Sequence, residues 1–448
     1  MLNKRFVEKI KKYIAKGALM RRGGKYIVAL SGGADSVTLA LVLKQAGYDV
    51  EAAHCNFRLR GVESDRDERF CREFCDANGI TLHVVHFDTK GYAEPHKVSI
   101  EMAARKLRYA YFEQLRKDIN ADDICVAHHK DDTVETVLMN LIRGTGIHGL
   151  TGIAARNGHI VRPLLCVFRS EIEEALQQAG QPYVTDSTNL EDDVVRNKIR
   201  LNLIPMMRRI NPSVSESIAV TAARLTDAAI VFDAAMMSAT TRVAEHNADG
   251  TMTISIDALR DEPSAEYVLF TMLKDKGFNP AQIESIHASM QAETGRIFSS
   301  ATHSLLIDRG RMVIEQNETE PPQPMKIPVT GLYVYNNNVK LRFTTTTIDN
   351  FTLERDRNRA CLDAAKIEMP LTVRRVKEGD RFTPFGMRGS KLVSDYLTDR
   401  KKNLFEKRKQ LVITDAAGRI IWLVGERPAN NCRITGDTQT VLNISLEK

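Results

Sequence analysis

A short glycine-rich turn, Ser31-Gly-Gly-Ala-Asp-Ser36, places one carboxylate inside a loop that otherwise suits an anion. Glycine lets the backbone approach a ligand closely, and the first N–H groups of a following helix point outward without partners. Asp35 would repel a bare anion there. The conflict disappears if the anion arrives with a divalent cation, because Mg²⁺ takes carboxylate and phosphate oxygens together. The turn therefore predicts a Mg²⁺–nucleotide site. The alternative is a tight structural turn in which Asp35 or Ser36 caps the helix.

A second group of acids opens the helix that is predicted to start near His129. Asp131 and Glu135 lie four residues apart and Asp132 and Glu135 three apart, which brings the three carboxylates toward one side of the first turns. These acids predict a bound cation, although acids at a helix N-terminus also stabilise the helix dipole by themselves. His128 and His129 raise the alternative of a zinc site, but no further His or Cys lies at helical ligand spacing within the motif.

Both motifs follow short apolar runs that alternate with helical stretches between residues 25 and 165. The runs are typical of strands and cover residues 26–30, 48–55, 81–87, 123–129 and 159–165. Helical segments begin near Ser36, Asp65, Ser99 and Asp131. Strands separated by helices predict right-handed crossovers and a doubly wound parallel sheet of the α/β class. Ligands bind beyond the carboxyl ends of such strands. The residues expected at those ends are Ser31, His54, Asp88 and His128.

The pattern changes beyond the first sheet, and we divide the chain into three domains. Residues 1–212 form the predicted nucleotide domain. Residues 213–318 are predicted to be mainly helical. A Pro-rich segment at 318–328 is predicted to be a linker, because proline breaks regular structure. Residues 329–448 form a β-rich C-terminal α+β domain with basic clusters.

Composition sets limits on location and partners. A chain of 448 residues is too long for a single core. Its first residues are charged and amphipathic, which favours a helix over a secretory signal, and no stretch is apolar enough to cross a membrane. Seven scattered cysteines fit a reducing cytoplasm better than a disulfide framework. The net charge of +6 is mildly basic, so the placement of basic clusters matters more than the total.

Several segments together resemble the N-type ATP pyrophosphatases with a PP-loop, and within them the tRNA(Ile)-lysidine synthetase family. They are the loop at 31–36, a His-x-x-x-x-Leu-Arg segment within 52–70, and a His-His-x-Asp-Asp-x-x-Glu-Thr helix within 126–153. Further similar segments follow in order to about residue 210, and a weaker one covers 379–399. One departure is Thr133, where the family usually has Gln.

The resemblance implies ATP and Mg²⁺ as cofactors, and free L-lysine and the tRNA(Ile) with a CAU anticodon as substrates. The wobble cytidine would be adenylated with release of pyrophosphate, and lysine would then displace AMP to give lysidine. The implied ATP-binding residues are Ser31, Gly32, Gly33, Ala34, Asp35, Ser36 and His54. Mg²⁺ would contact Asp35 and Asp132, and lysine would contact Asp131, Asp132 and Glu135. The implied catalytic residues are Asp35, Asp132 and Glu135.

Basic clusters in two domains fit a large polyanion that is held at more than one place. We expect tRNA to contact Arg196, Lys198, Arg200, Lys401 and Lys402. The oligomeric state stays open between a monomer and a homodimer.

Other functions remain as alternatives. A tRNA thiolase also carries a PP-loop but depends on cysteines, and the only helical pair, Cys71 and Cys75, is more typical of core packing. A synthetase that adenylates a small molecule normally needs a glutaminase domain, and no Cys-led N-terminus or nucleophile elbow is found. A non-enzymatic tRNA-binding module would have a damaged loop, whereas residues 31–36 are intact.

Overall fold

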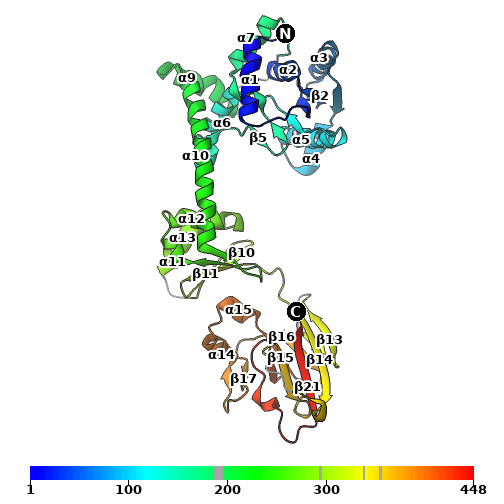
Figure 1. Cartoon of the computed structure of the whole chain (residues 1–448), viewed down its shortest axis with the longest axis vertical. Helices are drawn as coiled ribbons and strands as arrows, with labels where there is room; N and C mark the ends of the chain where they lie inside the picture. The colour runs from blue at the N-terminus through cyan, green and yellow to red at the C-terminus, as the bar shows by residue number, and fades with distance from the viewer. Residues whose placement is uncertain (186–194, 292–294, 337–338, 353–355, 448) are drawn as a thin grey trace. The chain divides into compact units, whose positions relative to one another are not determined.

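The computed structural model describes residues 1–185, 195–291, 295–336, 339–352 and 356–447. The chain forms two compact units, Met1–Asp233 and Ala234–Lys448 (Figure 1). No described helix combines the length and the apolar character that crossing a membrane requires.

A six-stranded sheet with the order β3-β2-β1-β4-β6-β5 organises the first unit. Its strands are β1 (Lys25–Ala29), β2 (Asp49–Asn56), β3 (Leu82–His86), β4 (Asp123–Cys125), β5 (Arg156–Asn157) and β6 (Ile160–Val161). The first four and β6 pair in parallel, as predicted, while β5 adds an antiparallel edge. Strands β4 and β6 are shorter than the apolar runs 123–129 and 159–165 that predicted them. Pro163 fixes φ and lacks an N–H group, so the chain leaves β6 for a 3₁₀ turn at Pro163–Cys166.

Helices cover both faces of this sheet. They are α1 (Lys4–Lys16), α2 (Ala34–Gln45), α3 (Val62–Asn78), α4 (Thr89–His96), α5 (Ile100–Asp118), α6 (Lys130–Arg143) and α7 (Arg169–Ala179). Residues of β1 alternate between two cores, as the period of a strand requires. Tyr26 and Val28 join the core that includes α1, α2, α3 and α7, whereas Ile27 packs against Phe112 and Leu115 of α5. The doubly wound α/β prediction is confirmed.

A basic helical segment packs against α6 after the sheet is complete. It consists of α8 (Val195–Lys198), a π-helical turn at Ile199–Leu203 and α9 (Ile204–Ile210). Pro205 has no N–H group for the carbonyl of Leu201, which explains why regular α-helical bonding does not pass through this turn. Ile199 and Ile204 form a small core with Val134 and Leu138 of α6. The long helix α10 (Val214–Val243) follows.

The second unit begins with a five-stranded antiparallel sheet and three helices. The sheet has the order β7-β8-β11-β10-β9. Its strands are β7 (Ala244–His246), β8 (Met252–Ser255), β9 (Arg296–Ser299), β10 (His303–Asp308) and β11 (Arg311–Gln316), and the helices are α11 (Ile256–Arg260), α12 (Ala265–Leu273) and α13 (Pro280–Ala288). The predicted helices are present, and the sheet is more extensive than the sequence indicated.

Two four-stranded antiparallel sheets form the C-terminal part, which confirms its β-rich character. Their orders are β12-β16-β19-β20 and β13-β14-β21-β15. The strands are β12 (Met325–Ile327), β13 (Gly331–Tyr335), β14 (Val339–Thr347), β15 (Arg359–Asp363), β16 (Leu371–Arg375), β19 (Leu411–Thr414), β20 (Ile420–Leu423) and β21 (Thr440–Glu447). A short hairpin, β17 (Arg381–Phe382) and β18 (Lys391–Leu392), precedes α14 (Val393–Asp399) and α15 (Leu404–Lys409). The prediction of an irregular linker at 318–328 is wrong for its last residues. Met325–Ile327 form β12, which pairs with β16 and buries Ile327.

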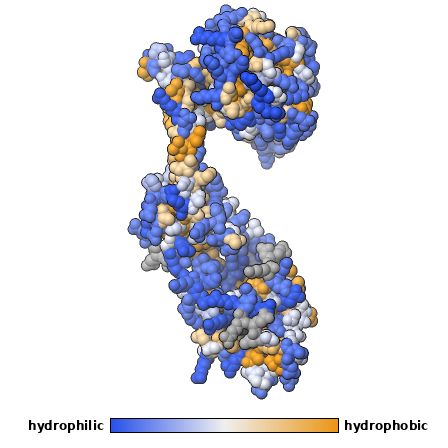
Figure 2. Space-filling view, in the orientation of Figure 1, coloured by the Kyte–Doolittle hydropathy of each residue, from blue (hydrophilic) through white to orange (hydrophobic). Residues whose placement is uncertain are grey.

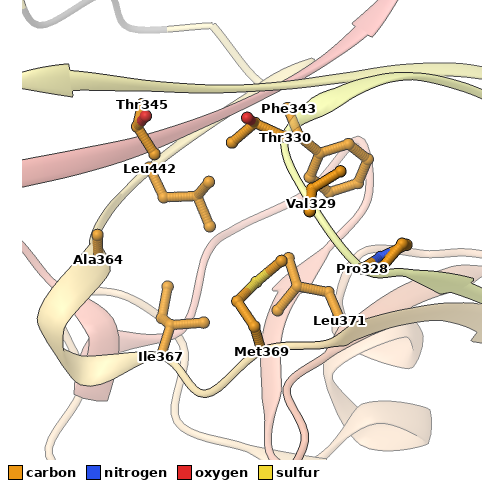
Figure 3. A pocket seen from close by; sticks show the side chains of 10 residues that line it. All are labelled: Pro328, Val329, Thr330, Phe343, Thr345, Ala364, Ile367, Met369, Leu371 and Leu442. Carbon is orange, nitrogen blue, oxygen red and sulfur yellow. The ribbon is translucent and has the colours of Figure 1, made fainter.

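An apolar pocket of about 340 Å³ lies between these two sheets (Figure 3). Phe343 of β14, Leu442 of β21 and Leu371 of β16 line it, and Val329 and Met369 also contribute. The polar side chains in the lining are those of Thr330 and Thr345. The pocket carries no charged side chain and therefore offers nothing to a phosphate or an amine.

Candidate functional site

The glycine-rich turn joins β1 to α2 and is held by its own serines. Ser36 Oγ donates to the carbonyl of Gly33 at 3.0 Å and accepts from the backbone N–H of Ser31 at 3.2 Å. The hydroxyls of Ser31 and Ser36 lie 3.1 Å apart. Gly33 is the N-cap of α2, and no side chain among the described residues caps the helix, so the alternative in which Asp35 or Ser36 serves only as a cap is not what the structure contains.

Gly32 combines a positive φ with close side-chain neighbours, and both disfavour a larger residue. Its φ of +87° lies in the region that favours glycine. An added Cβ would lie 3.3 to 3.4 Å from the side chains of Phe70, Cys71 and Val184. The carbonyl of Gly32 also accepts from the backbone N–H of Val184 at 2.9 Å. These contacts hold the turn on one side. The N–H groups at the start of α2 have no helical partners and can bind a ligand.

Asp35 lies in the first turn of α2 and faces α6 and α7. One of its carboxylate oxygens, Oδ1, is buried and has no hydrogen-bond partner among the described residues. The other lies 3.7 Å from His129 Nε2 and 3.7 Å from a guanidinium nitrogen of Arg169. Burial raises the pKa of Asp35, and His129 and Arg169 offset this only in part. A buried carboxylate oxygen without a partner is costly unless a cation or donor completes it.

His129 lies among three carboxylates at the start of α6. Its ring nitrogens are 3.4 Å from Asp131 Oδ2, 3.6 Å from Asp132 Oδ2 and 3.7 Å from Asp35 Oδ2. Burial alone would lower the pKa of His129, but the surrounding carboxylates outweigh it and raise this pKa. The structure therefore brings the PP-loop acid and two acids of α6 together around one imidazole.

The two aspartates of α6 are also bound by backbone groups. Asp132 accepts from the backbone N–H of His129 at 2.9 Å, as the acid of a capping box. Asp131 accepts from the backbone N–H of Arg169 at 2.9 Å. Burial acts to raise the pKa of Asp131, but His129 and this N–H group lower it overall. The second oxygen of Asp131, Oδ1, lies 4.0 Å from Arg208 Nη2.

Glu135 is separated from this group by its arginine partners. It is 1% exposed, and Arg200 donates to both of its oxygens, at 2.6 and 3.1 Å. Arg196 Nε lies 3.2 Å from the same carboxylate. Burial raises the pKa of Glu135 more than the two arginines lower it. Arg196 and Arg200, which the sequence predicts to contact tRNA, thus contact a residue expected to bind lysine.

Two histidines at the strand ends, His54 and His128, make hydrogen bonds through Nδ1 and have lowered pKa values. His54 Nδ1 donates to the carbonyl of Leu30 at 2.9 Å and lies 3.4 Å from Cys71 Sγ, and burial lowers the pKa of His54. His128 Nδ1 accepts from Arg162 Nε at 3.1 Å, and burial lowers the pKa of His128 to about 4. The lowered pKa values favour the neutral, hydrogen-bonding form of both rings.

The remaining predicted tRNA residues lie elsewhere. Lys198 is in α8, and it lines a hollow described below. Lys401 and Lys402 follow α14 in the second unit, and Lys402 Nζ pairs with Glu406 at 2.9 Å. One cation of that cluster is therefore already partnered.

Sequence analysis missed Arg169, which begins α7 and faces Asp35. The residue is separated from the loop by more than 130 positions, so only the fold brings it close. The one local indication of a role for Arg169 is that a helix starts after the apolar run 159–165. Helix starts at the ligand edge of a parallel sheet are common anion sites.

A divalent cation fits the residues at this edge. Hard cations take carboxylate oxygens, and the unpartnered Oδ1 of Asp35 supplies one beside Asp132. Within the described ranges, no group of three or more His, Cys, Asp or Glu side chains is arranged to hold a metal by itself. Phosphate and water would supply the other ligands, as is usual for Mg²⁺.

Family models match a part of each unit of the chain. Residues 2–207 match the model of the PP-loop domain, and residues 247–317 match that of the TilS substrate binding domain. The tRNA(Ile)-lysidine synthase of Bacteroides thetaiotaomicron is 47% identical over 97% of this chain and 98% of its own length. That of Parabacteroides distasonis is 43% identical over 98% and 99%. A solved tRNA thiolase from Methanococcus maripaludis is 19% identical, with a TM-score of 0.42 over 50% of this chain and 79% of its own.

The PP-loop, the acids of α6 and the relatives that match from end to end lead to one assignment. The chain uses the ATP-binding fold of the PP-loop enzymes. It belongs to the tRNA(Ile)-lysidine synthase family.

Proposed function

We propose that this protein joins L-lysine to the wobble cytidine of the tRNA(Ile) with a CAU anticodon, at the expense of ATP. The observation that carries the proposal is the meeting of the PP-loop acid with the acids of α6 around His129, all within 3.7 Å of its ring. One site can then hold the pyrophosphate of ATP and an incoming ammonium group side by side. We further propose that the reaction takes place in the cytoplasm.

In the first step the 2-carbonyl oxygen of cytidine attacks the α-phosphate of ATP, and pyrophosphate leaves. Ser31, Ser36 and the N–H groups that open α2 bind the leaving pyrophosphate, and Arg169 adds a positive charge next to Asp35. Asp35 and Asp132 would hold Mg²⁺, which would neutralise charge on the phosphates when bound. His54, buried behind the loop, keeps β1 and β2 in register through Leu30 and so positions the loop.

In the second step the ε-amine of lysine attacks carbon 2 of the adenylated cytidine, and AMP leaves with the former carbonyl oxygen. The amine must lose a proton, and taking it from a pKa of about 10.4 to neutrality costs roughly 4 to 5 kcal/mol. A carboxylate alone makes this harder, since it stabilises the ammonium form. We place the proton transfer after adenylation, when the bond to carbon 2 forms as the proton leaves.

Asp131, Asp132 and Glu135 are the proposed lysine contacts. For the ammonium group to reach Glu135, the guanidinium of Arg200 must give up at least one of its two donor contacts. Because both groups are cations, lysine and Arg200 compete for the same carboxylate. Arg196 and Arg200 then become free to contact tRNA phosphates, together with Lys198 and, in the second unit, Lys401 and Lys402.

The test is transfer of labelled lysine to purified unmodified tRNA(Ile) in the presence of ATP and Mg²⁺. We expect label in this tRNA, none in a tRNA with another wobble base, and one AMP and one pyrophosphate for each lysine. Asp35→Asn serves as the inactive control. Label in no tRNA, together with sulfur transfer or adenylation of a small molecule, would overturn the proposal in favour of the thiolase or the small-molecule synthetase.

A further inference from the structure

An apolar groove lies between the end of α6 and the basic segment that packs against it. It has a volume of about 570 Å³ and is lined by the end of α6 and by α8, the π-helical turn and α9. The lining residues with apolar side chains include Ile142, Val195, Leu201, Pro205 and Met206. Hydrophobic surface is visible over α9 (Figure 2).

The apolar side chains of this groove are exposed to an unusual degree. Ile142 is 64% exposed and Met206 62% exposed, and Ile210 at the end of α9 is 87% exposed. Contiguous exposed apolar side chains of this size mark interaction sites more often than chance placement. Ile142 and Met206 do not serve the small core between α6 and this segment, because Ile199 and Ile204 already fill that core.

Among the residues that the structure describes, the charged side chains in the lining have one sign. Lys198 and Arg209 are the charged residues among those that line the groove, and both are basic. A second copy of the chain docked by a two-fold axis would bring these cations toward each other. Insertion into a membrane needs a free amphipathic face, whereas this segment uses Ile199, Leu203 and Ile204 to pack on α6. An apolar floor with a basic rim suits unstacked nucleobases whose phosphates lie outside.

The groove is also placed next to the chemistry. Arg196 and Arg200 hold Glu135 on one side of the segment, and Lys198 and Leu201 line the groove on another. Glu135 and Ile142 are seven residues apart on α6, which corresponds to roughly 10 Å along its axis. This separation is within the reach of a nucleotide that neighbours a base bound at the acids of α6.

We propose that this groove receives the anticodon-loop bases next to the wobble cytidine, with Ile142 and Met206 against the base faces and Lys198 and Arg209 against their phosphates. The inference rests on the proposed function for the identity of the RNA. The contact with Ile142 and Met206 holds the target cytidine in the site by binding its neighbours, so it contributes to RNA affinity and not to the binding of ATP or lysine.

The experiment uses the full chain and an isolated anticodon stem–loop RNA of tRNA(Ile) with 2-aminopurine beside the wobble cytidine. We expect the wild-type protein to raise the 2-aminopurine fluorescence on binding, because the base leaves its stack. Ile142→Ser combined with Met206→Ser should weaken RNA binding about 5- to 20-fold, the low end for loss of apolar contact with a base. The KM values for ATP and lysine should stay unchanged.

The salt dependence of RNA affinity distinguishes the apolar contacts of Ile142 and Met206 from the charged contact of Lys198. The double variant should keep the slope of log K against log salt, whereas Lys198→Gln should lower it by about 0.7. The matched control is Met237→Ser, which removes an exposed methionine from α10 outside the groove and should leave RNA binding and fluorescence unchanged.

Unchanged RNA binding and fluorescence in the double variant would overturn the inference. So would a change in sedimentation of the free protein without any change in RNA binding, since the groove would then be a protein interface. If the double variant loses RNA binding but the wild-type protein never transfers lysine, the groove stands and the proposed function fails. If lysine transfer occurs and the double variant is unaffected, only the groove proposal fails.

Discussion

Arg200 and Glu135 form a two-point ion pair, with Arg200 Nε 2.6 Å from Glu135 Oε1 and Nη2 3.1 Å from Oε2. The carboxylate is buried and the guanidinium is partly exposed. This pair links the acidic helix to the basic segment that follows the sheet. A residue expected to bind substrate amine and a residue expected to bind substrate RNA therefore share one contact, and occupancy of one side affects the other.

Glu135→Gln should separate the two steps of the reaction. Glutamine keeps the size of the side chain but removes the charge that attracts the ammonium group. We expect tRNA-dependent exchange of pyrophosphate into ATP to persist within about tenfold, with lysine transfer lowered by at least a hundredfold, since a lost charged contact in a buried site costs about 2 to 4 kcal/mol.

The control for Glu135→Gln is Arg200→Gln, which keeps the carboxylate and removes its two-point partner while Arg196 remains. This variant should weaken tRNA binding and lower the KM for lysine, because one of the two competing cations is gone. Equal losses of pyrophosphate exchange and lysine transfer in Glu135→Gln would show that the residue supports the fold of α6 or serves both steps.

Asp132→Asn should impair both partial reactions. The amide keeps an oxygen for the backbone N–H of His129, so the capping box can persist, but it loses the charge offered to Mg²⁺. The measurements are pyrophosphate exchange and lysine transfer at several Mg²⁺ concentrations, with circular dichroism as the check of folding. Normal exchange in this variant would remove Asp132 from the proposed metal contacts.

Asp35→Asn should sharply lower adenylation while leaving the fold intact. Oδ1 of Asp35 has no partner within the described part of the chain, so its replacement by an amide removes no hydrogen bond made by that atom. We expect at least a hundredfold loss of pyrophosphate exchange and little change in melting temperature. Near wild-type exchange would contradict the Mg²⁺–nucleotide role of the loop.

The stability of the first unit should depend on pH through His129. Its pKa is raised in the folded state, because the carboxylates around it outweigh the effect of burial. The protonated ring therefore contributes stability that is fully present below its unfolded pKa of about 6.5 and is lost as pH rises through its higher folded pKa. Urea unfolding of wild-type protein and His129→Gln should differ most near pH 6 and least at alkaline pH. A constant difference would show that protonation is not involved.

The C-terminal cations should contribute to tRNA affinity without touching the chemistry. Lys401→Gln with Lys402→Gln should weaken binding of full-length tRNA and flatten its salt dependence, by about 0.7 to 0.9 in slope for each lost phosphate contact. Because Lys402 is already paired with Glu406, we expect less than two full contacts to be lost. Binding of the isolated stem–loop should not change, and an unchanged slope with full-length tRNA would remove these lysines from the interface.

The local features of the nucleotide unit could be predicted from sequence because their causes are local. Glycines between a buried strand and an apolar helix specify the turn at 31–36, and apolar runs separated by helices specify the parallel sheet. The start of α6 at Lys130 is within a residue of the expected position. The meeting of Asp35 with the acids of α6 followed from the rule that the carboxyl ends of parallel strands share an edge.

The partners of the site residues could not be predicted in the same way. Glu135 and Arg200 are 65 residues apart, and Arg169 reaches Asp35 across 134 residues, so no periodic pattern links them. The sequence also gave no strong signal for β7 and β12, which are three residues long and are held by pairing with β8 and β16. In such short strands tertiary pairing, rather than propensity, decides the conformation.

The antiparallel strand β5 has a consequence for how this edge of the sheet meets other protein chains. A parallel sheet that stopped at β6 would present a row of unpaired N–H and C=O groups to any neighbouring chain. Instead, the two-residue strand β5 pairs with β6 in the antiparallel direction. The guanidinium of Arg156 in β5 binds both oxygens of Asp123, at 2.8 and 3.0 Å. The edge is therefore short and charged, so strand addition from another molecule is disfavoured, and the catalytic unit carries its own protection against edge-to-edge aggregation.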